Sequence, residues 1–113
     1  MKVYIAGPMT GHDDWNHPAF NAAAEHIRAR GWTPLNPAEQ DLTFASNHPG
    51  EGDMIRAHYF RKDLPMLAEA DAIAVLPGWQ NSIGASLEVT IARVLALPIY
   101  DAETWQEVSD DWG

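Results

Sequence analysis

A glutamate within a predicted helix is the residue whose setting most strongly suggests chemistry. Glu88 belongs to the helical pattern of residues 83–96, and its neighbours at positions i−4, i+3, i+4 and i+7 are small or apolar. A carboxylate on such a face loses water on folding, so its pKa should rise, and a shifted carboxyl group marks a candidate functional site. The competing interpretation is a boundary glutamate that turns outward or pairs with Arg93 or Lys62.

Hydroxyl groups and a glycine precede Glu88 at the start of the same predicted helix. Ser82, Gly84 and Ser86 lie where unpaired backbone N–H groups and the helix dipole favour an anion. The plain alternative is that Ser82 only caps the helix. The two roles are compatible, so these residues are candidates for substrate binding.

A second candidate loop follows the first predicted strand. Gly7, Pro8 and Met9 open a segment, 7–11, that could cradle a phosphate. It has neither the GxGxxG pattern nor the lysine of a P-loop, so dinucleotide and nucleoside triphosphate binding are disfavoured, and a tight turn explains it equally well. Residues 12–17 contain types that bind metals, but without fixed spacing they favour a solvated polar turn. We therefore expect neither a metal nor a cofactor.

Strands and helices alternate along the chain. The expected strands are 2–6, 32–35, 72–76 and 97–100, and the expected helices are 18–30, 54–63 and 83–96. This alternation predicts an α/β fold, a small doubly wound (Rossmann/flavodoxin-like) parallel sheet of four to five strands with helices on both faces. We expect the second helix to be interrupted near Pro65, and residues 37–52 to form a long loop that serves as a lid or binding loop.

The last predicted helix has an apolar stripe that should face the core. Its members are Leu87, Ile91, Val94 and Leu95. In open parallel sheets ligands bind beyond the carboxyl ends of the strands, so the loops 7–17, 36–52 and 77–82 should surround the site. Pro77 and Gly78, in the third loop, and Trp15, in the first, join the candidate binding residues.

Composition excludes several classes of function. The chain has 113 residues, no cysteine and a formal net charge of −9. This length predicts one domain, residues 1–113, with an acidic tail over 102–113. The negative charge disfavours binding to a nucleic-acid polymer, and no stretch is long and apolar enough for a membrane span. Without a signal peptide or disulfide chemistry, we expect a cytoplasmic protein, in a bacterium or a phage-infected cell.

Several segments together resemble the nucleoside 2-deoxyribosyltransferase superfamily. They are Tyr4-Ile5-Ala6-Gly7-Pro8, Arg61-Lys62-Asp63-Leu64, Ala70-Asp71-Ala72-Ile73-Ala74-Val75 and Ser82-x-Gly84-Ala85-Ser86-x-Glu88. The resemblance spans roughly residues 3–100 and is strongest to the short phage and prophage branch, a domain of unknown function with a YIAGPMTG-like opening. It implies a small doubly wound α/β fold, in agreement with the pattern above.

The resemblance also assigns roles to individual residues. Glu88 matches the nucleophile, Asp63 the acid that protonates the departing base, and Tyr4 the phenol that orients the nucleophile. Ser82 falls at a position where relatives contact the sugar or the 5'-phosphate. The implied activity is cleavage or transfer at the N-glycosidic bond of a 2'-deoxynucleoside or its 5'-monophosphate, through a covalent intermediate on Glu88.

Two other functions remain open at this point. A protein with the same pocket but no turnover would bind, and so sequester, a nucleotide or a nucleotide-derived signal. A structural or regulatory module would use exposed tryptophans, Trp15, Trp79 and Trp105, as partner contacts. The resemblance implies a homodimer or higher homo-oligomer, because family enzymes complete each site with a neighbouring subunit.

Overall fold

The fold alternates strands and helices as the sequence predicts. The computed structural model describes residues 1–9, 12–39 and 43–108. The strands are β1 (Lys2–Ala6), β2 (Thr33–Leu35), β3 (Ala72–Val75) and β4 (Ile99–Asp101), and the helices are α1 (His17–Ala29), α2 (Thr43–Asn47), α3 (Gly52–Glu69) and α4 (Ile83–Val94). Three short 3₁₀ turns, 13–16, 37–39 and 79–81, lie between them. No helix of the described residues is long and apolar enough to cross a membrane.

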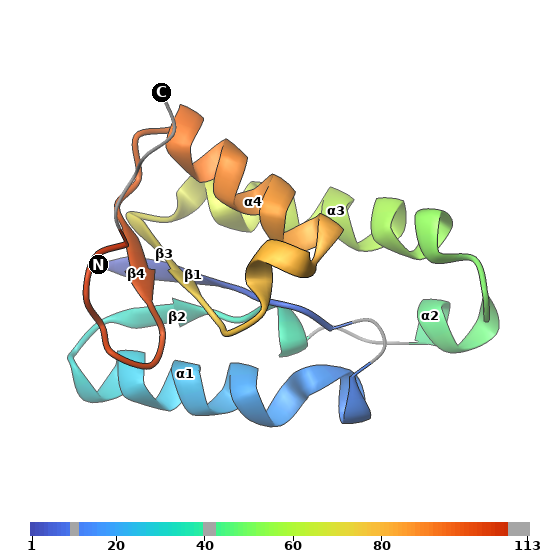
Figure 1. Ribbon diagram of the computed structural model, residues 1–113, viewed down its shortest axis with the longest axis horizontal. Helices are drawn as coiled ribbons and strands as arrows, with labels where there is room; N and C mark the ends of the chain where they lie inside the picture. Colours follow the sequence, from blue (N-terminus) through green and yellow to red (C-terminus); the bar gives the residue numbers. More distant parts are fainter. Residues whose placement is uncertain (10–11, 40–42, 109–113) are drawn as a thin grey trace.

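The sheet is parallel, four-stranded and ordered β2-β1-β3-β4. Helix α1 covers one face, and α3 and α4 cover the other (Figure 1). The predicted doubly wound α/β fold is thereby confirmed. The next two strands along the chain, β2 and β3, lie on opposite sides of β1, so the strand order reverses between β1 and β3. The carboxyl ends of β1 and β3 therefore flank the crevice where such folds bind ligands.

Strand β1 sends alternate side chains into two separate cores. Val3 and Ile5 pack on the side of α1, in a cluster that includes Phe20. Tyr4 and Ala6 pack on the opposite side, against residues of α3 and α4. This follows from the two-residue period of a strand, and it sends the fully buried Tyr4 toward α4.

Helix α3 continues through Pro65, which corrects the predicted interruption. It runs unbroken from Gly52 to Glu69. A proline inside a helix removes one backbone hydrogen bond and costs about 3 kcal/mol. Leu67, two residues after Pro65, is buried in the core beside β1 and β3, and Leu64 and Met66 pack against the same cluster, which favours the unbroken helix.

The apolar stripe predicted to face the core on α4 was wrong for three of its four members, and only Ile91 packs against the core. The buried residues of this helix are Ala85, Glu88, Val89 and Ala92. Leu87, Val94 and Leu95 are exposed, as is Ile83 at the start of the helix. Both sides of α4 carry apolar side chains, so periodicity alone could not decide which side faces the sheet.

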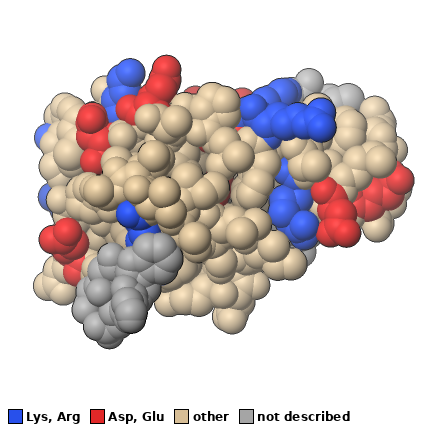
Figure 2. All heavy atoms as spheres, turned by 90° about the horizontal axis from the view of Figure 1, so that it is seen from above, with Lys and Arg blue, Asp and Glu red and all other residues tan. Residues whose placement is uncertain are grey.

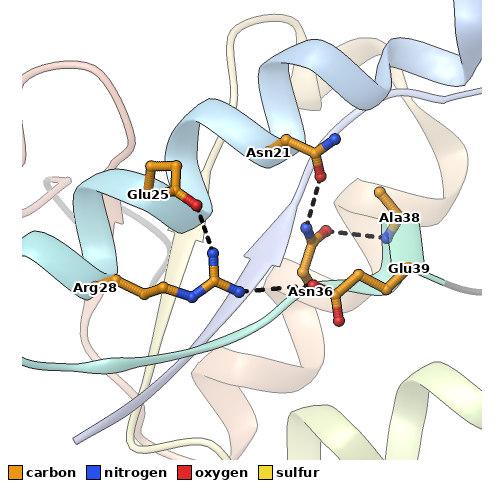
Figure 3. A network of polar contacts seen from close by, with 6 residues as sticks. All are labelled: Asn21, Glu25, Arg28, Asn36, Ala38 and Glu39. Carbon is orange, nitrogen blue, oxygen red and sulfur yellow. Dashed lines mark hydrogen bonds and ion pairs between the residues drawn. The ribbon is translucent and has the colours of Figure 1, made fainter.

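The segment expected to be a loop, 37–52, contains the 3₁₀ turn 37–39 and helix α2, and it ends at the first residue of α3. Its start is held by buried Asn36, whose amide donates to Asn21 at 3.1 Å and whose Oδ1 accepts from the backbone N–H of Ala38 at 3.0 Å (Figure 3). Residues 40–42 lie outside the described residues.

The C-terminal segment is packed rather than frayed as far as it is described. Tyr100 forms an antiparallel bridge with Glu107, and Ala102 belongs to the core beside α1. The tryptophans expected to be exposed, Trp15, Trp79 and Trp105, are partly buried. The acidic end, residues 109–113, lies outside the described residues.

Candidate active site

A cavity of about 510 Å³ opens at the carboxyl ends of β1 and β3. Three segments supply most of its wall: the loop after β1, one face of α3, and the start of α4 with the turn before it. This is the crevice that a doubly wound sheet leaves for a ligand. The volume suits a ligand the size of a nucleotide.

Tyr4, Asp63 and Glu88 meet at the inner end of the cavity. Each comes from a different element, β1, α3 and α4, and all three line the cavity although their side chains are buried. The Tyr4 hydroxyl donates a hydrogen bond to Oε2 of Glu88. Glu88 is only 5 % exposed, so it is not the outward-turned boundary glutamate considered above.

The electrostatics of this group follow from its burial. The pKa of Glu88 is raised to about 8: desolvation is the largest cause, the hydrogen bond from Tyr4 acts in the opposite direction, and the nearby charge of Asp63 adds a smaller rise. The pKa of Tyr4 lies well above its usual range because of burial and the negative charges of Glu88 and Asp63. The rise predicted for Glu88 is therefore confirmed, and near neutral pH its carboxyl is mostly protonated.

Most residues proposed from the sequence to bind substrate lie on the cavity wall. They are Gly7, Pro8, Met9, Trp15, Gly78, Ser82 and Gly84. Ser86 and Pro77 are not lining residues. The Ser86 hydroxyl instead donates to the backbone carbonyls of Trp79 and Gln80, each at 3.2 Å, and so holds the turn before α4.

Ser82 caps the N-terminus of α4, which is the structural role that the sequence suggests. Its Oγ accepts a hydrogen bond at 3.2 Å from the backbone N–H of Ala85, which makes it the N-cap of α4. The residue still lines the cavity, so its cap and a ligand contact are compatible.

Two glycines of the wall are explained by the backbone around them. A Cβ on Gly7 would lie 2.7 Å from Cβ of Leu76, closer than side chains pack. Gly78 has φ +85°, a left-handed conformation that favours glycine. Both residues shape the loops after β1 and β3, and neither requires a ligand to account for its glycine.

Trp15 lines the cavity from an unusual backbone turn. Asp14, Trp15 and Asn16 have φ values of 51°, 54° and 62°, all left-handed. Such a conformation costs roughly 1–2 kcal/mol for a residue with a side chain. The Asn16 amide donates to the carbonyl of Pro8 at 2.9 Å and ties this turn to the loop after β1. Thr10 and Gly11, between them, lie outside the described residues.

The sequence analysis missed the contribution of α3 beyond Asp63. The other lining residues of α3 lie, together with Asp63, at positions i, i+3, i+4, i+7, i+8 and i+11 of one helix face; they are Gly52, Ile55, Arg56, Tyr59 and Phe60. That spacing defines one face of a helix and could have been found once Asp63 was placed there. In residues 1–9, 12–39 and 43–108, no three histidines, aspartates or glutamates gather as metal ligands.

Comparison with known structures identifies a protein of similar fold. It is described as a 2-deoxyribosyltransferase from the psychrotolerant bacterium Bacillus psychrosaccharolyticus. The TM-score is 0.64 at 21% sequence identity, over 88% of this chain and 70% of that chain. At this identity the likeness shows the fold, a four-stranded parallel sheet flanked by helices. No curated protein sequence matches the chain.

The family of the chain is shown by its sequence profile. The profile of a domain of unknown function, DUF4406, matches residues 1–101. This range contains the whole sheet, all four helices and each residue that lines the cavity. The chain therefore belongs to the DUF4406 family, in a fold that it shares with a 2-deoxyribosyltransferase.

Proposed function

We propose that the protein cleaves, or transfers across, the N-glycosidic bond of a 2'-deoxynucleoside or its 5'-monophosphate. The observation that carries this proposal is the hydrogen bond from buried Tyr4 to buried Glu88, with Asp63 beside them, at the inner end of a nucleotide-sized cavity. The shared fold with a 2-deoxyribosyltransferase supports the same reaction class. We also propose that the protein is a short enzyme of the phage type and that it works in the cytosol, where nucleotides are present.

The proposed reaction uses Glu88 as nucleophile. Tyr4 holds Oε2, and the other carboxylate oxygen attacks C1' through an oxocarbenium-like transition state, forming a C1'–O ester while the C1'–N bond breaks. Asp63 relays a proton from solvent to the departing base. In the second step water, or the N–H of a second base, attacks C1', its proton leaves through Asp63, and the Glu88 carboxylate is released. Water as acceptor gives hydrolysis, and a base gives transfer.

The proposed placement of the substrate follows from the cavity wall. C1' of the sugar lies beside Tyr4 and Glu88, and the base extends toward Asp63 and the loop that carries Trp15. The 5' end then lies toward the start of α4, one helical turn or about 6 Å from Glu88. Gly84, in this turn, has space for a ligand near its backbone, since a Cβ there would meet only the Phe60 ring, at 3.6 Å.

The test of this function is a panel of 2'-deoxynucleosides and their 5'-monophosphates. Free base is measured by chromatography, and the intact protein is weighed by mass spectrometry. We expect release of base, a deoxyribosyl adduct on the protein, and activity that grows between about pH 6 and pH 9, because Glu88 must lose its proton near pH 8. If nucleotides bind but none is cleaved, the protein is a binder that sequesters them. If nothing binds, the proposed function is wrong.

We also propose that the protein forms a homodimer through the outer face of α4. Ile83, Leu87 and Val94 form a stripe along this face, and Ile83 and Val94 are 61% and 72% exposed. Figure 2 looks down on this side of the molecule and shows a broad area without charged side chains. An exposed apolar helix face is typical of an interface.

The dimer is tested by light scattering at micromolar concentration. We expect twice the chain mass of 12.5 kDa, and we expect Val94→Glu, which places a charge in the contact, to give the monomer. Ala22→Glu, at an exposed position on α1 on the opposite face of the molecule, adds the same charge away from the stripe and should leave the dimer intact. A monomeric mass for the unsubstituted protein would contradict the proposal.

A further inference from the structure

One cationic side chain lies on the wall of the cavity and has no part in the chemistry proposed above. Of the lining residues in the described part of the chain, Arg56 is the only lysine or arginine. It lies on α3, on the same face as Asp63 and seven residues before it. Two helical turns separate them, or about 10 Å along the axis. Arg56 thus lies well away from the position proposed for the bond that breaks.

The guanidinium group of Arg56 is oriented by one ion pair, and it has further N–H donors beyond that pair. Its Nη1 lies 3.1 Å from Oδ1 of Asp53, three residues earlier on the helix. The Asp53 side chain is fully exposed, and such ion pairs contribute little energy because water screens them. The pair directs the side chain while other N–H donors of the guanidinium are available to a ligand. The Arg56 side chain itself is 31% exposed.

The local charge explains why this position matters. The chain has a net charge of −9, and two of its acidic residues, Asp63 and Glu88, lie on the cavity wall. An anionic ligand would be repelled unless a cation within the cavity compensates. A guanidinium is suited to this because it binds phosphate oxygens through two parallel hydrogen bonds.

The position of Phe60 relates Arg56 to the proposed substrate. Phe60 lies one turn after Arg56 on α3 and faces Gly84 at the start of α4, so Arg56 and this end of α4 border the same part of the cavity. The proposed 5' end of the sugar points to that part. We propose that Arg56 binds a 5'-phosphate and makes the 5'-monophosphate, rather than the nucleoside, the preferred substrate. This inference rests on the proposed function.

The test compares ligands that differ only in the phosphate. Calorimetry measures the affinity of the four common 2'-deoxynucleosides and their 5'-monophosphates for protein carrying Glu88→Gln, so that turnover does not interfere. Arg56→Gln should weaken the monophosphates by about tenfold to a hundredfold and leave the nucleosides within about twofold. Arg56→Lys, which keeps the charge but loses the two-point contact, should fall between. Arg61→Gln on the same helix removes an equal charge at an exposed position that does not line the cavity, and should change neither series.

The possible outcomes separate this inference from the proposed function. If both ligand series bind and Arg56→Gln weakens them equally, or weakens neither, the role of Arg56 is wrong while the proposed function stands. If Arg61→Gln weakens the monophosphates as much as Arg56→Gln, the effect is general electrostatics and the inference also fails. If neither series binds to the protein with Arg56 intact, the proposed function and the inference fail together.

Discussion

Glu88→Gln is expected to lose base release by roughly a thousandfold or more. The amide has nearly the shape of the carboxyl group and can still accept the hydrogen bond from Tyr4, but it cannot form the ester with C1'. Because Glu88 is buried and already bonded within the core, this change leaves the packing intact. The measurement is chromatography of free base, together with mass spectrometry of the protein, from which the deoxyribosyl adduct should be absent.

Two further variants make this result specific. Glu69→Gln makes the same chemical change at an exposed position near the end of α3 and should keep full activity. Tyr4→Phe should keep part of the activity and move its pH dependence upward, because the Tyr4 hydrogen bond lowers the pKa of Glu88 and its loss would raise it. A Glu88→Gln protein that retains more than a few per cent of the activity would remove Glu88 from the nucleophile role.

The arrangement of the fold was predictable because its strands and helices are marked by local signals. Gly7-Pro8 ends β1, and Gly31, with φ +80°, ends α1, as the sequence indicates. The errors arose where tertiary packing decides. The helix continues through Pro65 where Leu64, Met66 and Leu67 pack at the core, and both sides of α4 are apolar, so only the packed structure shows which side faces the sheet.

The central residues of the candidate site were predicted from the sequence, but the part of the cavity wall that α3 supplies was not. Glu88 is recognisable alone, since a carboxylate among small and apolar neighbours is unusual, and its burial is confirmed. Tyr4 and Asp63 were proposed only through the family resemblance, because nothing local in a strand or a mixed helix marks them. Arg56 and Phe60 were missed because α3 has no clear apolar period, so only their helical spacing from Asp63 marks the face that the helix turns to the cavity.

The second large effect concerns stability, which should fall as the pH rises. A glutamate in an unfolded chain has a pKa of about 4.3, whereas that of Glu88 in the folded protein is about 8. Between these values the folded state binds more protons than the unfolded state, so the contribution of Glu88 is complete below about pH 4 and is lost as the pH approaches 8. The loss is on the order of 5 kcal/mol, a large part of the stability of a small domain.

Glu88→Gln should therefore stabilise the fold in alkaline solution. The amide cannot ionise, so the difference in unfolding free energy between the variant and the unsubstituted protein should be small near pH 5 and should reach several kcal/mol in favour of the variant near pH 9. Urea unfolding at both values measures it, and Glu69→Gln corrects for general effects of pH and charge. A difference that does not change with pH would mean that Glu88 is ionised throughout. The same carboxylate that is proposed to attack C1' would then cost the fold nothing, and its burial would need another explanation.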